Sequence, residues 1–436
     1  MLVAAASARH VVSREGTYPA TTEFAPISTL MNRAIAADKL PGGVVVIGHG
    51  GRTVFHQAYG SRKLAGEQGL DGSPAPAEPM TEDTIFDIAS LTKCLATAIA
   101  VMQLYEHGKV AFDESVQTYL PDFNAANDPE REKVTVRMLL THTSGEPIDV
   151  DLRDSWGLDR TDKAEGIHRA LTAPLQSGPG EVYRYADINY ILLGALIEKL
   201  TGQTEDKYAQ QNIFAPLGMT ETRYLPPASL LPRIAPTAID DQSSAEPGKN
   251  PNFGNLLRGT VHDPTARRMG GVAGHAGVFS TAHDVSIYAQ ALLDRLANRP
   301  SRFPLQQATV ALMTTPQQPG HKTGQVEAAN DAVRKAVATT PNTTDPLLAP
   351  HYPAVEGQEL FGFGWDIDTD FSKPRGLIFP VGSFGATGFT GTSLWLDPGS
   401  DTYVILLSNS IHPRGRPPIS GLRGDVATAA AEALRL

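Results

Sequence analysis

The run FDIASLTK, residues 86–93, opens a strong helix pattern and puts a serine and a lysine three residues apart in its first turn. The helix periodicity begins at Ser90, continues to His107 and stops at Gly108, a residue type that readily takes the left-handed conformation beyond a helix C-terminus. The sequence therefore predicts a helix over residues 90–107. A three-residue step places the side chains of Ser90 and Lys93 on one helical face.

Ser90 and Lys93 could together carry nucleophilic chemistry. A serine hydroxyl is a weak nucleophile until a neighbouring base accepts its proton, and a lysine at this spacing can serve as that base or tune it. The helix N-terminus adds free backbone N–H groups and a positive dipole end, which suit an anionic intermediate. The alternative is an N-cap serine beside a solvated lysine, because S-x-x-K alone is a weak signal.

Two further stretches could act with this pair. Tyr185-Ala186-Asp187 directly precedes a helix predicted over residues 188–200, and a tyrosine there can act as a base if a cation stabilises its phenolate. GATGFTG, residues 385–391, leads into a predicted strand, and its small residues allow a substrate to lie against the strand edge. The alternatives are a packed tyrosine with a satisfied hydroxyl and an ordinary Gly-rich turn.

Strand patterns stand at both ends of the chain, and helix patterns fill the middle. This order predicts an α/β fold in which a helical domain is inserted into a discontinuous sheet domain. A β-hairpin is expected over residues 44–59, and strands are expected over residues 361–367, 392–396 and 403–408. The predicted division is a tail over 1–23, a sheet domain over 24–89 and 360–436, a mainly helical domain over 90–298, and a Pro/Thr/Gln-rich surface insertion over 299–359 with at most one helix.

The order and spacing of these motifs resemble the serine β-lactamase and penicillin-binding-protein superfamily. Within it, the similarity is strongest to class C β-lactamases, family VIII carboxylesterases and penicillin-binding-protein-4-like D-alanyl-D-alanine peptidases. The resemblance covers nearly the whole chain and rests on IASLTK (88–93), LLTHTSG (139–145), YAD (185–187), LLG (192–194), GHAG (274–277), TGFTGT (387–392) and SN (408–409). It implies a β-lactamase/transpeptidase-like fold, with an antiparallel sheet flanked by helices.

The resemblance also implies roles for individual residues. Ser90 would be the acylated nucleophile, Lys93 its proton partner, and Tyr185 the base that relays the proton to the leaving group. The backbone N–H groups of Ser90 and Phe389 would form the oxyanion hole. The expected substrate-binding residues are Asp187, His275, Ala386, Thr387, Gly388, Asn409 and Arg414. His275 could instead be a loop histidine bonded to backbone, and Arg414 a solvated arginine.

The chain departs from the family pattern at two positions. Asp187 stands where the second motif usually ends in Asn, and an anion there would hold Lys93 protonated, which favours Tyr185 as the base. Ala386 stands where the strand motif usually begins with Lys or His, so a substrate carboxylate loses its usual cation. HKTG, residues 321–324, contains the Lys-Thr-Gly sequence of the family's strand motif, but it lies in the insertion, where no strand is predicted.

Composition excludes several classes of protein and site. The 436 residues carry a formal charge of −10 with no basic stripe, which argues against a nucleic-acid partner. No apolar run is long enough to span a membrane, and the single Cys94 excludes an internal disulfide or a cysteine zinc site. His262-Asp263 and His283-Asp284 lack tight metal-ligand spacing, so neither a metal nor a cofactor is expected. The N-terminal MLVAAASA is compatible with a trimmed export signal, and hence a periplasmic or secreted protein, or with a frayed tail of a cytoplasmic one.

The sequence thus favours a serine hydrolase that forms an acyl-enzyme on Ser90 and acts on short acyl esters. A β-lactamase or D-alanyl-D-alanine carboxypeptidase is the alternative within the superfamily. A penicillin-binding sensor that is acylated without turnover is the alternative from another class. The expected partner is a small ester or amide substrate, and the oligomeric state stays open.

Overall fold

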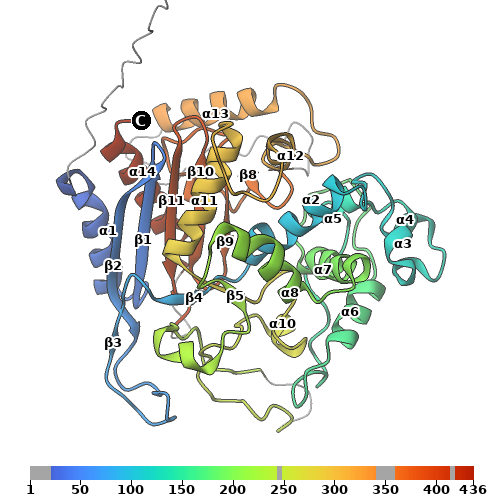
Figure 1. Cartoon of the computed structure of the whole chain (residues 1–436), viewed down its shortest axis with the longest axis horizontal. Helices are drawn as coiled ribbons and strands as arrows, with labels where there is room; N and C mark the ends of the chain where they lie inside the picture. Colours follow the sequence, from blue (N-terminus) through green and yellow to red (C-terminus); the bar gives the residue numbers. More distant parts are fainter. Residues whose placement is uncertain (1–20, 243–247, 340–358, 413–417) are drawn as a thin grey trace, which may run out of the picture.

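The computed structural model describes residues 21–242, 248–339, 359–412 and 418–436 (Figure 1). Its main sheet has the strand order β3-β2-β1-β11-β10-β9-β8-β7, and every paired neighbour is antiparallel. The strands are β1 (Gly42–His49), β2 (Arg52–Lys63), β3 (Glu78–Pro79), β7 (Leu360–Phe361), β8 (Asp366–Asp368), β9 (Phe384–Gly388), β10 (Thr392–Asp397) and β11 (Thr402–Ser408). The predicted α/β class with an antiparallel sheet is confirmed.

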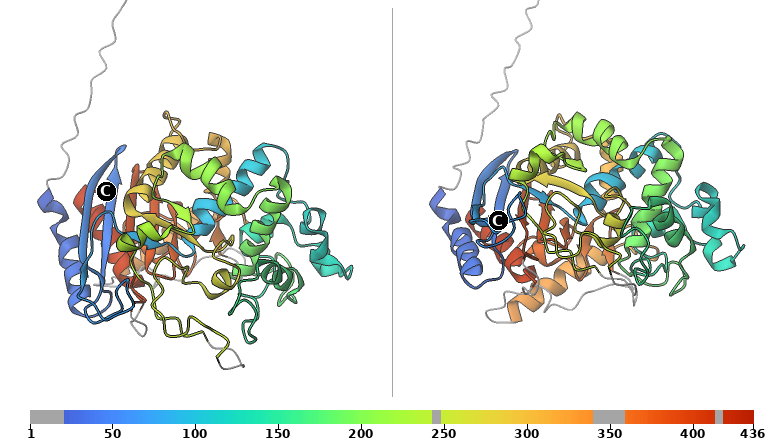
Figure 2. Two further views of the ribbon diagram at one scale, coloured as in Figure 1. Left: turned by 60° about the horizontal axis from the view of Figure 1, so that its bottom comes forward. Right: turned by 90° about the horizontal axis from the view of Figure 1, so that it is seen from below.

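Helices cover both faces of this sheet (Figures 1 and 2). Side chains alternate between the faces of a strand, so Val45 and Ile47 of β1 join one core while Val44 and Val46 join the other. The first core lies under α1 (Ala25–Ala36) and α14 (Ser420–Leu434), and the second lies under α2 (Ala98–Glu106) and α11 (Ala282–Leu296). Strands from the two ends of the chain therefore belong to one sheet, because β1 pairs with β11.

Most of the remaining helices lie on the side of the sheet away from α1 and α14 (Figure 2), whereas α13 (Gln325–Thr339) crosses the top of the molecule in Figure 1. The structure also has a small second sheet. That sheet has the order β4-β6-β5, with β4 (Ile85–Asp87), β5 (Arg223–Tyr224) and β6 (Val278–Thr281). The helices are α3 (Val116–Tyr119), α4 (Pro129–Glu132), α5 (Val136–Leu140), α6 (Lys163–Thr172), α7 (Asp187–Thr201), α8 (Glu205–Ala209), α9 (Ala215–Leu217), α10 (Pro264–Arg268), α12 (Gln307–Met313) and α13 (Gln325–Thr339). None of the described helices is both long enough and apolar enough to span a bilayer.

Two local predictions need correction. The strand expected over 361–367 is two short strands, β7 and β8, because the chain turns between them at Gly364, whose φ is +88°. The segment expected to be a surface insertion carries two helices, α12 and α13. Val310 and Met313 of α12 are buried in the second core, which lies under α2 and α11. HKTG, residues 321–324, is exposed and not a strand, as expected. The domain boundaries stay a prediction.

The helix predicted over 90–107 is present but begins unusually. Its first part, Lys93–Thr97, is π-helical, and α2 continues from it to Glu106. Gly108 has a φ of +67°, the left-handed value expected beyond the helix end. π-Helical turns are rare and are frequently found at functional sites. This one contains Lys93.

Candidate active site

The turn that presents Ser90 is fixed by Asp87. Strand β4 ends at Asp87, and one carboxylate oxygen accepts a 2.9 Å hydrogen bond from the backbone N–H of Ala89. The other accepts a 2.7 Å bond from the N–H of His262. Ala89 adopts a φ of +48°, which is costly for a residue with a Cβ and persists only where the surroundings hold it. The chain therefore turns sharply at Ala89 and leaves Ser90 half-buried.

Lys93 is held by three partners. Its Nζ lies 3.1 Å from Ser90 Oγ, 2.7 Å from Oδ1 of Asp187 and 3.0 Å from the carbonyl oxygen of His275. The side chain is 4% exposed. Burial lowers the pKa of this lysine, but the charges of Asp187 and Tyr185 outweigh burial and raise the pKa above its usual value. Lys93 is therefore a fixed cation beside the Ser90 hydroxyl.

Tyr185 lies on the other side of the same hydroxyl. Its phenol donates a 2.8 Å hydrogen bond to Ser90 Oγ, and its ring centroid is 4.8 Å from Nζ of Lys93. His142 packs against the Tyr185 ring and accepts a 3.1 Å bond at Nδ1 from the N–H of Ala186, which fixes the backbone before α7. Burial raises the pKa of Tyr185 to about 12, against the lowering effect of Lys93. The phenol thus carries its proton at neutral pH.

The turn between β9 and β10 is tied to the Ser90 turn. The hydroxyl of Thr390 donates a 2.7 Å bond to the carbonyl of Asp87, and that of Thr392 donates a 3.0 Å bond to the carbonyl of Ile88. A Cβ at Gly388 would lie 2.5 Å from this Ile88 oxygen, so only glycine allows the approach. These contacts bring Phe389 to the same cavity as Ser90, with its ring 73% exposed.

The cavity at Ser90 has a volume of about 260 Å³, enough for a small substrate. It brings together most of the predicted catalytic and strand residues: Ser90, Lys93, Tyr185, Ala386, Thr387, Gly388 and Phe389. Asp187 and His275 do not line it, and instead both contact Lys93. A hydroxyl between a phenol and an ammonium group, facing a cavity, is an arrangement that can perform nucleophilic catalysis.

Asn409 lies outside this cavity, in contrast to its expected substrate contact. Its side-chain N–H groups donate 2.8 Å bonds to the carbonyls of Arg62 and Pro236, and the residue is buried. These bonds join the end of β11 to β2 and to the loop that contains Pro236, which is a structural role. Arg414 lies outside the described residues.

Two charged residues of the cavity were missed by sequence reasoning. Arg423, from α14, donates hydrogen bonds of 2.8 and 3.0 Å to the carbonyls of Gly388 and Thr392. Burial lowers the pKa of its guanidinium to about 10. Asp366, at the start of β8, lines the cavity close to β9. No motif marks either residue, because both reach the cavity through strand pairing and helix packing over long sequence separations.

Asp187, Asp263 and His275 each place one ligand atom within 4.8 Å of the others, a spacing that could hold a metal ion. However, Nζ of Lys93 already lies 2.7 Å from Asp187, and Nε2 of His275 lies 2.8 Å from Oδ1 of Asp263. A second cation there would be repelled by the ammonium group. We therefore interpret these residues as an ion-pair network around Lys93.

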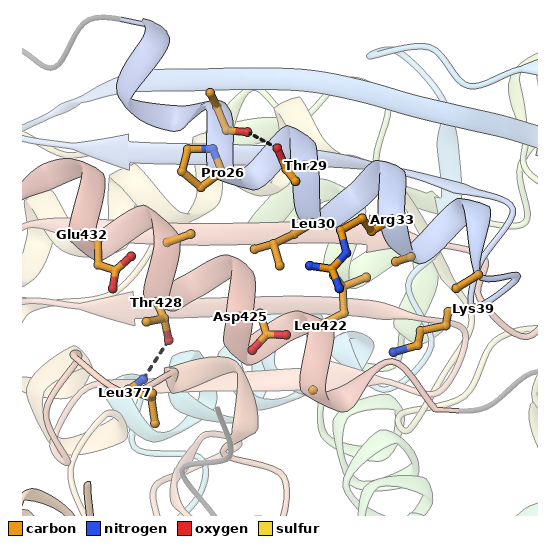
Figure 3. A pocket seen from close by; sticks show the side chains of 15 residues that line it. Pro26, Thr29, Leu30, Arg33, Lys39, Leu377, Leu422, Asp425, Thr428 and Glu432 are labelled. Carbon is orange, nitrogen blue, oxygen red and sulfur yellow. Dashed lines mark hydrogen bonds between the residues drawn. The ribbon is translucent and has the colours of Figure 1, made fainter. Parts of the chain in front are cut away.

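The largest cavity described lies elsewhere, between α1 and α14, with a volume of about 1040 Å³ (Figure 3). Its wall carries the cations Arg33 and Lys39 and the anions Asp425 and Glu432, together with small and apolar residues. It does not include Ser90. The smaller cavity at Ser90 is therefore the candidate active site.

Comparisons with known proteins agree with this geometry. The profile of the family described as Beta-lactamase matches residues 27–427. The chain is 30% identical over 373 residues to a protein of Escherichia coli (strain K12) named "Putative D-alanyl-D-alanine carboxypeptidase", covering 82% of this chain and 76% of that protein. It is 30% identical over 455 residues to "N-acetylmuramyl-L-alanine amidase" of Bacillus subtilis (strain 168), covering 97% and 92% of the two chains.

Solved structures share the fold. Unliganded simvastatin synthase (LovD) from Aspergillus terreus superposes with a TM-score of 0.64 at 23% identity, covering 96% of this chain and 100% of that one. EstCE1, titled a hydrolase with promiscuous acyltransferase activity, has a TM-score of 0.62 at 21% identity, covering 94% and 98%.

Proposed function

The chain belongs to the Beta-lactamase family and is a hydrolase, and on this premise we propose that it cleaves short carboxylic esters through an acyl-enzyme on Ser90. One observation carries the proposal. The Ser90 hydroxyl lies 2.8 Å from the Tyr185 phenol and 3.1 Å from Nζ of Lys93, at the wall of a cavity sized for a small substrate.

In the proposed acylation step, Ser90 Oγ attacks the carbonyl carbon and passes its proton to the oxygen of Tyr185. Tyr185 gives its own proton to the leaving-group oxygen as the ester bond breaks. This relay needs no standing phenolate, which suits a phenol whose pKa is raised to about 12. The Lys93 cation, 4.8 Å from the ring, stabilises the negative charge that develops on the phenol during the transfer.

The oxyanion that forms from the carbonyl oxygen would be stabilised by the backbone N–H groups of Ser90 and Phe389. The hydroxyl bonds from Thr390 and Thr392 hold the two turns together, so the donors are in place before the reaction. Preorganised donors of this kind are usually the largest single contribution to acyl transfer. In deacylation, water attacks the acyl carbon, and Tyr185 accepts its proton and returns one to Ser90.

Two features support esters over other substrates. Ala386 provides no cation on β9 for a substrate carboxylate, whereas a neutral ester requires none. A cavity of about 260 Å³ also suits a short acyl group. The position of Tyr185 beside Ser90 argues against a sensor without turnover, because the proton relay needed for deacylation is available.

A peptidase or amidase is the second candidate. Arg423 lines the cavity and could meet a carboxylate in place of a residue at position 386. The names of two relatives, a D-alanyl-D-alanine carboxypeptidase and an N-acetylmuramyl-L-alanine amidase, favour cleavage of an amide bond. A β-lactamase activity would require the same carboxylate contact.

A three-substrate assay tests the proposal. Hydrolysis of p-nitrophenyl butyrate is compared with that of nitrocefin and of an acyl-D-alanyl-D-alanine peptide, and intact mass identifies any trapped acyl adduct. We expect the highest kcat/KM for butyrate and an adduct that is absent from Ser90→Ala. Turnover of the peptide or of nitrocefin without butyrate hydrolysis would overturn the esterase proposal in favour of a peptidase or a β-lactamase. An adduct without turnover of any substrate would indicate a sensor.

A further inference from the structure

Asp366 is a carboxylic acid in the wall of the proposed active site that the reaction does not use. It begins β8 and pairs with Gly385 of β9, directly before Ala386. Both Asp366 and Ala386 line the cavity that contains Ser90. Asp366 is 6% exposed, so its carboxyl group is largely removed from bulk water.

Little inside the protein compensates a charge on this carboxyl group. The hydroxyl of Thr369 donates a 2.6 Å hydrogen bond to Oδ1 of Asp366. Burial raises the pKa of Asp366 to about 7, and the Thr369 bond and the Lys93 charge offset this only in part. The cation that acts on Asp366 is Lys93, which is itself paired with Asp187, and no ion pair joins Asp366 to a cation among the described residues.

A second acid, Glu359, lies close enough to Asp366 to feel its charge, although it does not line the cavity. Glu359 lies just before β7, which pairs with β8, and is partly buried. Burial, together with the charges of Asp370 and Asp366, raises its pKa to about 7. A positive group near Asp366 would relieve this accumulation of negative charge.

We infer that Asp366 binds a positively charged group of the substrate, so that this hydrolase prefers esters or amides that carry an ammonium group. This inference rests on the proposed function of Ser90 and names the substrate class of the same site. An ammonium group supplies the missing partner, and a charge-assisted hydrogen bond in a desolvated cavity is stronger than one in water. The absence of a cation at position 386 leaves Asp366 available for that contact.

A structural role for Asp366 is the competing explanation. The Thr369 bond closes the turn after β8, and the N–H of Thr369 donates 2.9 Å to the hydroxyl of Ser372. A purely structural residue would keep this turn folded and have no effect on the choice between charged and neutral substrates. The variant Asp366→Asn keeps an acceptor for Thr369 and removes the charge, so it separates the two roles.

The experiment measures kcat/KM for two isosteric substrate pairs. p-Nitrophenyl β-alaninate differs from p-nitrophenyl butyrate by an ammonium group in place of a methyl group on the acyl side. Butyrylcholine differs from 3,3-dimethylbutyl butyrate by a quaternary nitrogen in place of carbon on the leaving-group side. The assay is run at about pH 8, above the pKa of Asp366. There we expect the kcat/KM for the charged substrate, divided by the kcat/KM for its neutral isostere, to fall about tenfold or more in Asp366→Asn for at least one pair.

The control is Asp370→Asn, which removes the same charge from the same segment at an exposed position that does not line the cavity. Its ratio should stay close to that of the wild type. If Asp366→Asn does not fold, Ala386→Lys tests the same contact, because it adds a competing ammonium group to the cavity that Asp366 lines and should lower the preference for charged substrates.

The outcomes separate this inference from the function on which it rests. Butyrate hydrolysis with equal ratios in wild type and Asp366→Asn for both pairs would overturn the ammonium site and leave the esterase proposal standing. An equal loss of preference in Asp370→Asn would overturn a direct contact in favour of a general field effect. No turnover of any ester, with no adduct on Ser90, would overturn the proposed function itself.

Discussion

Nζ of Lys93 lies 2.7 Å from Oδ1 of Asp187, and this ion pair fixes which proton the site can move. Without the carboxylate, burial would lower the pKa of Lys93 and make a neutral amine accessible. With it, the lysine stays protonated, and the phenol of Tyr185 is the group left beside Ser90 that can exchange a proton. Asp187, which stands where Asn is expected from the family resemblance, therefore supports the separate roles proposed for Lys93 and Tyr185.

Asp187→Asn should shift the pH dependence of the reaction. Removal of the anion lowers the pKa of Lys93, because the effect of burial is then less opposed. If catalysis requires the cation, the alkaline limb of kcat/KM should move to lower pH, and activity near neutrality should fall. A pH–rate profile on butyrate checks this. Higher activity near neutrality would instead identify neutral Lys93 as the base, because the variant has more neutral amine at that pH. An alkaline limb at the wild-type position would show that this limb does not report the titration of Lys93.

Tyr185→Phe tests the phenol directly. Phenylalanine keeps the ring contacts with His142 and Phe371 and removes only the group that donates to Ser90. If Tyr185 relays the proton, kcat should fall by about 10²–10⁴-fold. The melting temperature should change little, because the packing is conserved. A loss of less than tenfold would transfer the base role to Lys93.

Ser90→Ala should abolish both turnover and covalent labelling. The hydroxyl lies at the meeting point of the Tyr185 and Lys93 contacts, and removing it leaves the cavity without that nucleophile. A fluorophosphonate or penicillin probe followed by intact-mass analysis measures the result. Labelling that persists in the variant would require a different nucleophile and would reject the site as described.

Sequence patterns predicted the parts of the site that are local in the chain. The three-residue step from Ser90 to Lys93 and the start of α7 after Tyr185 follow from helix periodicity and its stop signals. The apolar run of β1, followed by turn residues, likewise indicated a strand of the sheet. The unusual π-helical turn at Lys93 was not predicted, because no periodicity in the sequence marks it, and it coincides with the buried contacts of that residue with Asp187 and His275.

Contacts made across the fold could not be predicted in this way. Arg423 reaches Gly388 only because α14 packs against the sheet, and Asp366 reaches the cavity only because β8 pairs with β9. The Asp263–His275 pair likewise joins a helix cap to a loop near Lys93. Such pairings depend on tertiary packing and leave no periodic signal, so only the arrangement of the folded chain shows them.

Glu205 gives a prediction for stability. The Thr97 hydroxyl lies 2.6 Å from both Oε1 of buried Glu205 and the carbonyl of Gly274, and one hydroxyl hydrogen cannot serve two acceptors. A protonated Glu205 that donates to Thr97 resolves the conflict. Burial raises the pKa of Glu205 from 4.5 to about 7. The folded state therefore holds a proton that the unfolded state releases, and stability falls as pH rises from 4.5 through 7.

Glu205→Gln should remove this pH dependence, because the amide also donates to Thr97 but does not ionise. Relative to wild type, the variant should gain stability as pH rises from about 5 to 8, by on the order of 3 kcal/mol. Melting temperatures of both proteins across this range measure the gain, and other titrating groups cancel in the difference. A difference that stays constant with pH would show that Glu205 is ionised throughout.

Ala386→Lys tests whether the missing strand cation limits anionic substrates. An ion pair in a partly desolvated cavity is worth more than one at the surface, so kcat/KM for penicillins or acyl-D-alanyl-D-alanine should rise roughly tenfold, or about 1.4 kcal/mol. Neutral butyrate should gain little, and Ala386→Met, of similar length without charge, should improve neither. The gain should shrink with added salt, because screening weakens a pair that water can reach. Equal gains for Lys and Met would assign the effect to shape. No gain would mean either that Asp366 holds the new ammonium group or that Arg423, 2.8 Å from the Gly388 carbonyl, already supplies the charge.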